Sequence, residues 1–169
     1  MLAIRPLVRS DIQPIADAFA RLGWNKPASQ YERYLDDASK DIRTTLVATW
    51  LDTFAGYLTI KWQSDYPPFR DADIPELQDF NVLPEFRRRG FGAHLMDDAE
   101  AIVSARSATV GLGVALDPDY GSAQRLYVKR GYVPDGLGAM WHGTRVKWGD
   151  SVRVDDDLVL YLTKSLRKA

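Results

Sequence analysis

The segment Phe86–Ala93, with the sequence Phe-Arg-Arg-Arg-Gly-Phe-Gly-Ala, lies between an expected strand over residues 76–83 and an expected helix over residues 90–106. Its two glycines let the backbone approach a ligand closely. The free N–H groups at the helix start and the positive end of the helix dipole favour an anion such as a pyrophosphate. The three arginines add charges that pair with phosphate oxygens. The alternative interpretation is a glycine-permitted turn with a solvated basic face.

Two other phosphate-binding motifs are excluded at this segment. The dinucleotide fingerprint of the Rossmann fold needs a third glycine, and Leu95 stands where that glycine would fall. The phosphate loop of nucleotide hydrolases needs Gly-Lys-Ser/Thr after its second glycine, and none follows Gly92.

The rest of the chain predicts strands and helices in a mixed order. Residues rich in β-branched and aromatic side chains flank a turn at residues 51–53 and predict a hairpin. The expected strands cover residues 2–5, 44–50, 54–62, 76–83, 109–115 and 158–163, with another beginning at residue 132. The expected helices cover residues 10–22, 28–38, 90–106 and 122–130. Strands that come first as a hairpin and then alternate with helices indicate an α/β (α+β) fold with a mixed sheet.

Composition limits the classes of protein that this chain can belong to. Its 169 residues, 46% of them hydrophobic, fit one domain with its own core. Without cysteine there is no disulfide scaffold, thiolate metal site or cysteine nucleophile. A net charge of -1 argues against a general nucleic-acid binder. No apolar run approaches the ~20 residues that span a bilayer, and the N-terminus turns polar at once, so we expect a cytoplasmic protein that does not bind membranes.

From Glu76 to Val133 the sequence resembles the core of the GNAT superfamily of N-acetyltransferases. Residues 87–92 match that family's Gln/Arg-x-x-Gly-x-Gly/Ala pyrophosphate loop, between a strand and a helix as the family requires. Residues 123–132, Ala-Gln-Arg-Leu-Tyr-Val-Lys-Arg-Gly-Tyr, are similar to its Ala-x-x-Leu-Tyr-x-x-x-Gly-Phe segment. The resemblance implies a twisted, mostly antiparallel sheet flanked by helices, with parallel strands around Val82 and Val110 splayed for acetyl-CoA. It implies one domain over residues 1–169, with an irregular insertion at residues 134–157.

The same resemblance implies acetyl-CoA as co-substrate, no metal, and a set of binding residues. Backbone groups of the strand and the glycine loop would hold the acetyl group, the pantetheine and the pyrophosphate. These residues are Phe80, Asn81, Val82, Arg87, Arg88, Arg89, Gly90, Phe91, Gly92 and Ala93. Tyr127 is the counterpart of the family's general acid, which protonates the leaving thiolate. The alternative for Tyr127 is a core aromatic residue on a helix.

The general base is assigned from the strand that leads to the loop. Glu76 and Asp79 lie where the family often places an acid. Strand alternation puts them on opposite faces, so one of them faces the amine unless a bulge changes the count. We prefer Glu76, and a water chain to a more distant carboxylate is the alternative.

Several other residues carry two interpretations each. Tyr120 stands where many family members place an asparagine that contacts the cofactor, seven residues before Tyr127, so that contact is not transferred to this chain. Residues 155–157, three aspartates, form either a site that attracts a cationic amine or a solvated turn. Trp24, Trp141, Trp148 and Tyr66 either line an acceptor pocket or pack in the core and on the surface. The two histidines, His94 and His142, lack the spacing of a metal site.

The function that follows is transfer of an acetyl group from acetyl-CoA to a primary amine of a small molecule. The resemblance implies direct attack within a ternary complex, and the absence of cysteine leaves no cysteine acyl-enzyme. Two alternatives remain: acetylation of a protein or peptide, and a non-catalytic acyl-CoA-binding sensor. The expected partners are acetyl-CoA and the amine, with no nucleic acid, and the sequence allows a homodimer.

Overall fold

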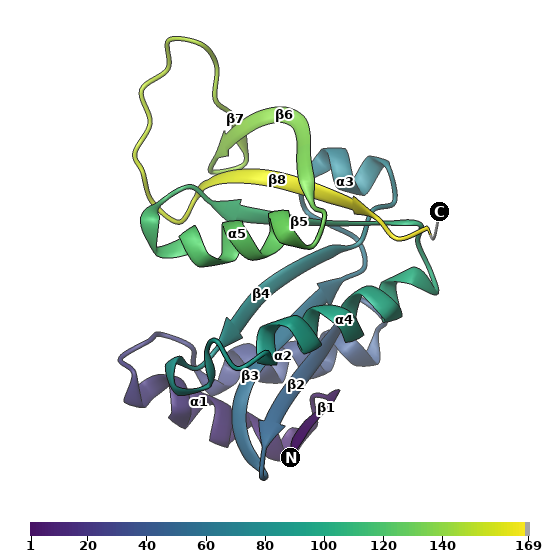
Figure 1. Cartoon of the computed structure of the whole chain (residues 1–169), viewed down its shortest axis with the longest axis vertical. Coiled ribbons are helices and arrows are strands. Elements are labelled where there is room, and N and C mark those ends of the chain that lie inside the picture. Colours follow the sequence, from purple (N-terminus) through teal and green to yellow (C-terminus); the bar gives the residue numbers. More distant parts are fainter. Residues whose placement is uncertain (168–169) are drawn as a thin grey trace. The chain divides into compact units, whose positions relative to one another are not determined.

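The computed structural model describes residues 1–167 of the chain, which form two compact units (Figure 1). Unit 1 consists of residues 1–62 and 77–105. Unit 2 consists of residues 63–76 and of the chain from residue 106 onward.

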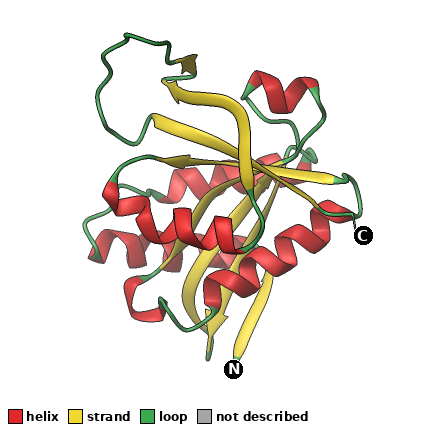
Figure 2. Cartoon of the chain, turned by 45° about the horizontal axis from the view of Figure 1, so that its top comes forward, coloured by secondary structure: helices red, strands yellow, loops and turns green. Residues whose placement is uncertain are grey.

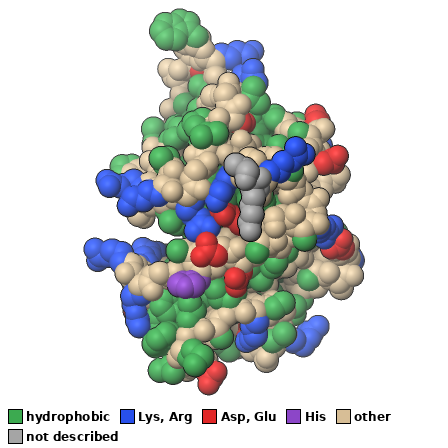
Figure 3. Space-filling model, turned by 45° about the vertical axis from the view of Figure 1, so that its right-hand side comes forward, with side chains coloured by type: hydrophobic (Ala, Val, Ile, Leu, Met, Phe, Trp, Pro, Cys, Tyr) green, Lys and Arg blue, Asp and Glu red, His purple; other side chains and the backbone are tan. Residues whose placement is uncertain are grey.

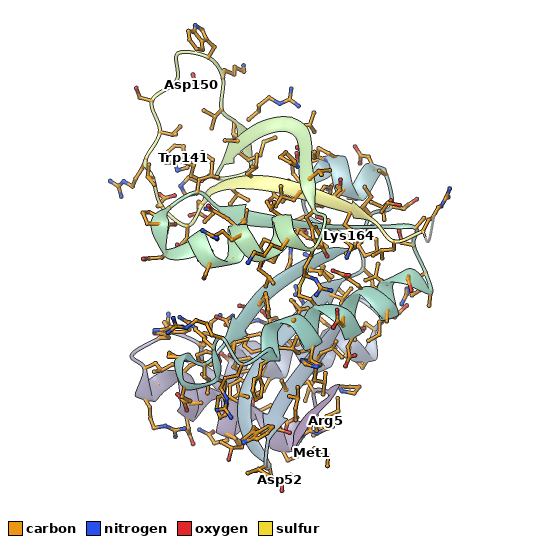
Figure 4. The ribbon with its side chains drawn as sticks, viewed as in Figure 1. Met1, Arg5, Asp52, Trp141, Asp150 and Lys164 are labelled. Carbon is orange, nitrogen blue, oxygen red and sulfur yellow. The ribbon has the colours of Figure 1, made fainter. Side chains whose placement is uncertain are left out.

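Unit 1 contains a sheet with the strand order β1-β2-β3-β4. Its strands are β1 (Leu2–Pro6), β2 (Arg43–Trp50), β3 (Thr53–Lys61) and β4 (Glu76–Val82), the last from residue 77 onward. The pairs β1–β2 and β2–β3 are antiparallel, and β2 and β3 form the predicted hairpin. Asp52 marks its turn in Figure 4. A Cβ on Gly56 of β3 would lie 2.5 Å from the carbonyl oxygen of Asn81 in β4, so glycine is required where β3 lies beside β4.

Helices with one apolar face supply the rest of the core of unit 1. They are α1 (Ile12–Arg21), α2 (Ala28–Ser39) and α4 (Phe91–Ser104), with the short 3-10 helices η1 (Arg9–Asp11) and η2 (Pro84–Phe86). Leu95, Met96, Ala99 and Val103 of α4 are buried, as their helical spacing predicts. Because α4 packs on β1, β2 and β3, its first turn is held in a fixed place beside the sheet.

Unit 2 contains a sheet with the strand order β5-β8-β6-β7, and all its pairs are antiparallel. The strands are β5 (Thr109–Ala115), β6 (Val133–Trp141), β7 (Thr144–Arg145) and β8 (Leu158–Ser165). The helices are α3 (Pro67–Asp71) and α5 (Gly121–Lys129), with the 3-10 helix η3 (Pro118–Tyr120) (Figure 2).

Two segments of unit 2 are more regular than the sequence predicts. Residues 63–75, whose three prolines and several charges predict a loop, contain α3, and Pro67 and Pro68 are tolerated in its first turn, where a missing N–H costs nothing. The expected insertion at residues 134–157 begins as β6. Gly136 and Gly138 have positive φ, and the register against β8 shifts between Pro134 and Ala139, so the strand lacks the alternation that would identify it.

The predicted α/β (α+β) class with a mostly antiparallel sheet flanked by helices is confirmed. The splaying of the strands around Val82 and Val110, and the single domain over residues 1–169, stay predictions. Among residues 1–167 no helix is long and apolar enough to cross a membrane.

Candidate functional site

The turn that opens α4 adopts a backbone conformation suited to glycine. Gly90 is the residue before the helix and has φ 85°, in the left-handed region. Its carbonyl oxygen accepts the backbone N–H of His94 at 3.1 Å, and the Nδ1 atom of that histidine lies 2.8 Å from the same oxygen. The first N–H groups of a helix have no acceptor within the helix and lie at the positive end of its dipole. This turn can therefore bind an anionic group.

Gly92 brings the first turn of α4 against β4. A Cβ on this residue would lie 3.0 Å from Cζ of Phe80 and 3.8 Å from Cγ2 of Val82. The absence of a side chain thus sets the close approach of helix and strand. Within unit 1 the structure brings together the glycine loop and the strand residues that the sequence assigns to the same ligand.

The three arginines of the loop have different surroundings. The Nε atom of Arg87 donates to the Val82 carbonyl oxygen at 2.9 Å, and its guanidinium lies 5.8 Å from the Trp24 ring centroid. The guanidinium of Arg89 lies 5.3–5.6 Å from three ring centroids, those of Trp50, Phe86 and Phe91. Arg88 is exposed and has φ 57°. Arg89 is therefore engaged with aromatic rings, and Arg88 projects from the turn.

We predict that Arg88→Ala and Arg89→Ala change different properties of the protein, the first its affinity for coenzyme A and the second its stability. Arg88→Ala is expected to weaken coenzyme A binding about tenfold, the equivalent of one exposed charge-assisted hydrogen bond, and to leave stability unchanged. Arg89→Ala is expected to lower the free energy of unfolding by about 1 kcal/mol through lost cation–π contacts. Calorimetric titration and urea denaturation measure the two quantities. Equal losses of affinity in both variants, with unchanged stability, would contradict this division.

Asp79 is surrounded by five side-chain donors, all within unit 1. Lys26 Nζ and Asn81 Nδ2 donate to Oδ1 at 2.6 and 2.9 Å. Gln30 Nε2 and the Tyr34 hydroxyl donate to Oδ2 at 2.7 and 2.8 Å, and the Tyr57 hydroxyl donates to the same oxygen.

The donors keep the Asp79 carboxylate ionised. Burial alone would raise its pKa, but the charge of Lys26 and the hydrogen bonds from Lys26, Tyr57 and Tyr34 outweigh burial and hold the pKa below its usual value. Burial, with the nearby Asp79 charge as the second cause, raises the pKa of Tyr57, so that hydroxyl stays a donor. An acid that is ionised, hydrogen-bonded at both oxygens and low in pKa is a poor proton acceptor.

Glu76, the other candidate base, has different surroundings. Its side chain is 6% exposed, and the Ser64 hydroxyl donates to Oε2. The same hydroxyl oxygen accepts the backbone N–H of Tyr66 at 3.0 Å. This carboxylate is thus fixed by the segment that precedes α3.

Tyr127 is buried in α5, with 7% of its surface exposed, and its ring centroid lies 5.9 Å from that of Tyr132. Burial, with the influence of Tyr120 as the second cause, raises the pKa of Tyr127 above its usual value. A phenol that stays protonated through the neutral and alkaline range can serve as a proton donor.

The residues of the expected insertion are tied to their own unit. Trp141 Nε1 donates to Asp155 Oδ1 at 3.3 Å, and Asp156 is hydrogen-bonded to Tyr120, whose pKa is raised by burial first and by that aspartate next. The loop between β7 and β8, with Asp150 in it, extends away from the sheet of unit 2 (Figure 4). Trp148 in this loop is fully exposed.

The other aromatic candidates are packed. Tyr66 is buried, stacks on Tyr161 with ring centroids 3.6 Å apart, and donates to Asp135 Oδ2 at 2.7 Å. The ring stack and the hydrogen bond of Tyr66 therefore contribute to the packing of unit 2. Trp24 in unit 1 is 37% exposed, and one face of its ring stacks on Phe19 with ring centroids 5.6 Å apart.

Two groups of side chains come together that the sequence did not indicate. His142, Asp155 and Asp157 have ligand atoms within 4.8 Å of one another, a metal-compatible set that spacing along the chain did not indicate. Asp79 accepts hydrogen bonds from Lys26, Gln30 and Tyr34, which lie up to 53 residues away in the sequence. The spacing of apolar residues along the chain does not predict such long-range contacts.

Three features lie at the start of α4. Gly90 has a left-handed conformation, Gly92 lies close to β4, and Arg88 is exposed. The free N–H groups at this helix start suit an anionic group such as a pyrophosphate.

Comparisons with known proteins agree with this geometry. A family model described as the acetyltransferase (GNAT) family matches residues 10–132. A GNAT-family acetyltransferase structure from Desulfovibrio desulfuricans is similar at TM-score 0.73 and 15% identity, with 99% of this chain and 100% of that chain covered. An aminoglycoside 6'-N-acetyltransferase complexed with coenzyme A has TM-score 0.68 and 17% identity, with 99% and 98% covered.

Another similar structure is the ribosomal-protein-S18-alanine N-acetyltransferase from Escherichia coli, with TM-score 0.69, 16% identity, and 100% of this chain and 96% of that chain covered. The comparison with curated protein sequences gives no match. The residues that the family model matches make up most of the chain and include β4, the glycine loop and α4. The chain therefore belongs to the acetyltransferase (GNAT) family and is an acetyl-CoA-dependent acyltransferase.

Proposed function

We propose that this enzyme transfers the acetyl group of acetyl-CoA directly to a primary amine of a small molecule. The observation that carries the proposal is the turn at the start of α4, where Gly90 has φ 85° and Gly92 lets the helix start pack closely against Phe80 of β4. A small acceptor is supported by the net charge of -1, which gives no general attraction for a strongly charged protein partner. The face in Figure 3 carries both basic and acidic side chains.

The reaction has three chemical requirements that the protein must meet. The amine must lose a proton, because an alkyl ammonium with pKa ~10 has no lone pair at neutral pH. The developing oxyanion needs donors, which backbone N–H groups of Phe80–Val82 would supply. The leaving thiolate needs a proton, and Tyr127 is the proposed donor. The backbone of Arg87–Ala93 and the side chain of Arg88 would hold the pyrophosphate.

Glu76 is the proposed base, acting on the amine directly or through water. The support comes from comparing the two candidates, since Asp79 is held as an ion by five donors. Glu76→Gln is expected to lower kcat/KM by about 10²-fold or more, because general bases contribute about 10²–10⁴-fold. The exposed Glu32→Gln is the control and is expected to match wild type. A pH profile of kcat/KM that is the same in Glu76→Gln and wild type would remove this residue from the role.

The experiment that tests the function is release of coenzyme A from acetyl-CoA across a panel of amines. Because the similar structures include an aminoglycoside and a ribosomal-protein acetyltransferase, the panel contains aminoglycosides, polyamines, amino acids and peptides with free N-termini. We expect turnover with a small amine and none with peptides. Turnover confined to peptides would favour protein acetylation, and binding of acetyl-CoA without any turnover would favour the sensor.

A further inference from the structure

Strand β4 changes its backbone conformation at Asp79. This residue has φ 48°, in the left-handed region, whereas strand residues have strongly negative φ. Aspartate and asparagine tolerate this region better than other residues with a side chain. Such a residue inside a strand bends it and interrupts the regular pairing. Here the carbonyl oxygen of Gln78 accepts the hydroxyl of Thr59 at 2.9 Å.

The five donors join separate segments of unit 1 at this bend. They come from the loop after α1, from two positions of α2, from β3 and from β4 itself. These donors are Lys26, Gln30, Tyr34, Tyr57 and Asn81. Lys26 also donates to the hydroxyl of Tyr57 at 3.0 Å, so the charge and the hydroxyls form one connected network. Removing the anion would leave several partly buried donors without an acceptor.

We propose that Asp79 is a positioning residue, whose carboxylate holds the bend in β4 and so fixes the backbone of Phe80–Val82 for acetyl-CoA. The proposal rests on the proposed function for the ligand that this backbone binds. The bend comes directly before Phe80, and Phe80 and Val82 are the residues that Gly92 approaches. A change in the course of the strand would therefore alter both the backbone donors and the surface that meets the start of α4.

The test uses two variants that separate the backbone from the charge. Asp79→Asn keeps a side chain that tolerates positive φ but removes the anion. Lys26→Met combined with Asp79→Asn also removes the ammonium, so no unpaired charge is left in a partly buried place. This double variant is measured in place of Asp79→Asn where the single variant does not fold.

Asp11→Asn is the matched control. Asp11 also lies in unit 1, and its side chain is 12% exposed, against 20% for Asp79. It accepts two hydrogen bonds from Arg5, at 2.6 and 2.7 Å, and one from the backbone N–H of Val8 at 2.9 Å. Its loss is expected to lower stability without touching the backbone of β4.

Three quantities are measured for each variant: affinity for coenzyme A by calorimetry, kcat and KM for both substrates, and the amide chemical shifts of residues 80–82 by NMR. We expect the Asp79 variants to shift these amides, to bind coenzyme A about tenfold more weakly, and to lose about 10²-fold in kcat, the size of effect that a small misplacement produces. The control is expected to keep all three at wild-type values.

Wild-type amide shifts for residues 80–82 in both Asp79 variants would overturn the proposal, as would losses that the Asp11→Asn control reproduces. The amide shifts need neither ligand nor turnover. If the wild-type protein binds no coenzyme A or acetylates no amine, the proposed function fails, and the shifts alone still decide whether Asp79 holds the strand.

Discussion

Gly90→Val is expected to reduce the affinity for coenzyme A by about 10²-fold or more. The residue has φ 85°, which valine adopts only with strain, so the turn before α4 would rearrange. The N–H groups at the helix start would then no longer converge on the pyrophosphate. Each hydrogen bond to a charged group contributes about 1.5–3 kcal/mol, and losing two of them gives that factor. Isothermal titration with coenzyme A measures it.

Gly131→Val is the matched control for this substitution. Gly131 has φ 89° just after α5, and a Cβ there would meet nothing within 4 Å. The two variants therefore introduce the same backbone strain, about 1–2 kcal/mol, at different helix ends. Only the variant at Gly90 is expected to lose affinity. Wild-type affinity in a folded Gly90→Val protein would contradict the assignment of this turn to the pyrophosphate, and so would an equal loss in Gly131→Val.

Tyr127→Phe is expected to lower kcat by about 10²–10⁴-fold, the usual contribution of a general acid. The phenyl ring still fills the buried position in α5, so folding and affinity for coenzyme A are expected to stay close to wild type. Tyr132→Phe removes the hydroxyl of the neighbouring buried ring and serves as the control. A wild-type kcat in Tyr127→Phe would mean that the thiolate takes its proton elsewhere.

The burial of Tyr127 predicts how protonation of the leaving thiolate depends on pH. Because the pKa of Tyr127 is raised, this residue keeps its proton as the pH rises through 10. Its ionisation therefore produces no fall in kcat between pH 8 and pH 10. On the acidic side, the pKa of Asp79 is lowered, so Asp79 stays ionised there and an acidic limb above pH 5 would report another group.

Several helices and strands could be predicted because each is specified by residues close together in the sequence. The hairpin of β2 and β3, the apolar face of α4 and the strand β5 follow from periodicity and turn chemistry within a few residues. The start of β6 was predicted near residue 132, but its extent to Trp141 was not, because its glycines at 136 and 138 break alternation. The short helix α3 was hidden by the prolines that begin it.

The sequence predicted the glycine loop of the candidate site but not the contacts of its other residues. Gly90 and Gly92 could be assigned because each has a conformational or steric reason to be glycine, and both reasons appear in the structure. The arginines of one run looked equivalent, yet Arg89 lies among aromatic rings that come from separate segments. The network on Asp79 could not be inferred, because its donors converge only after the sheet and helices of unit 1 have packed.

Acetyl transfer itself gives the most direct measurement. The enzyme is incubated with the amine panel and with acetyl-CoA that carries carbon-13 in its acetyl group. The masses of the products are determined by mass spectrometry, and the amount of free coenzyme A is measured in parallel. We expect one labelled acetyl group on the nitrogen of a small amine for each coenzyme A released, at a rate that falls in Tyr127→Phe. Binding of acetyl-CoA with no labelled amine anywhere in the panel would contradict the account.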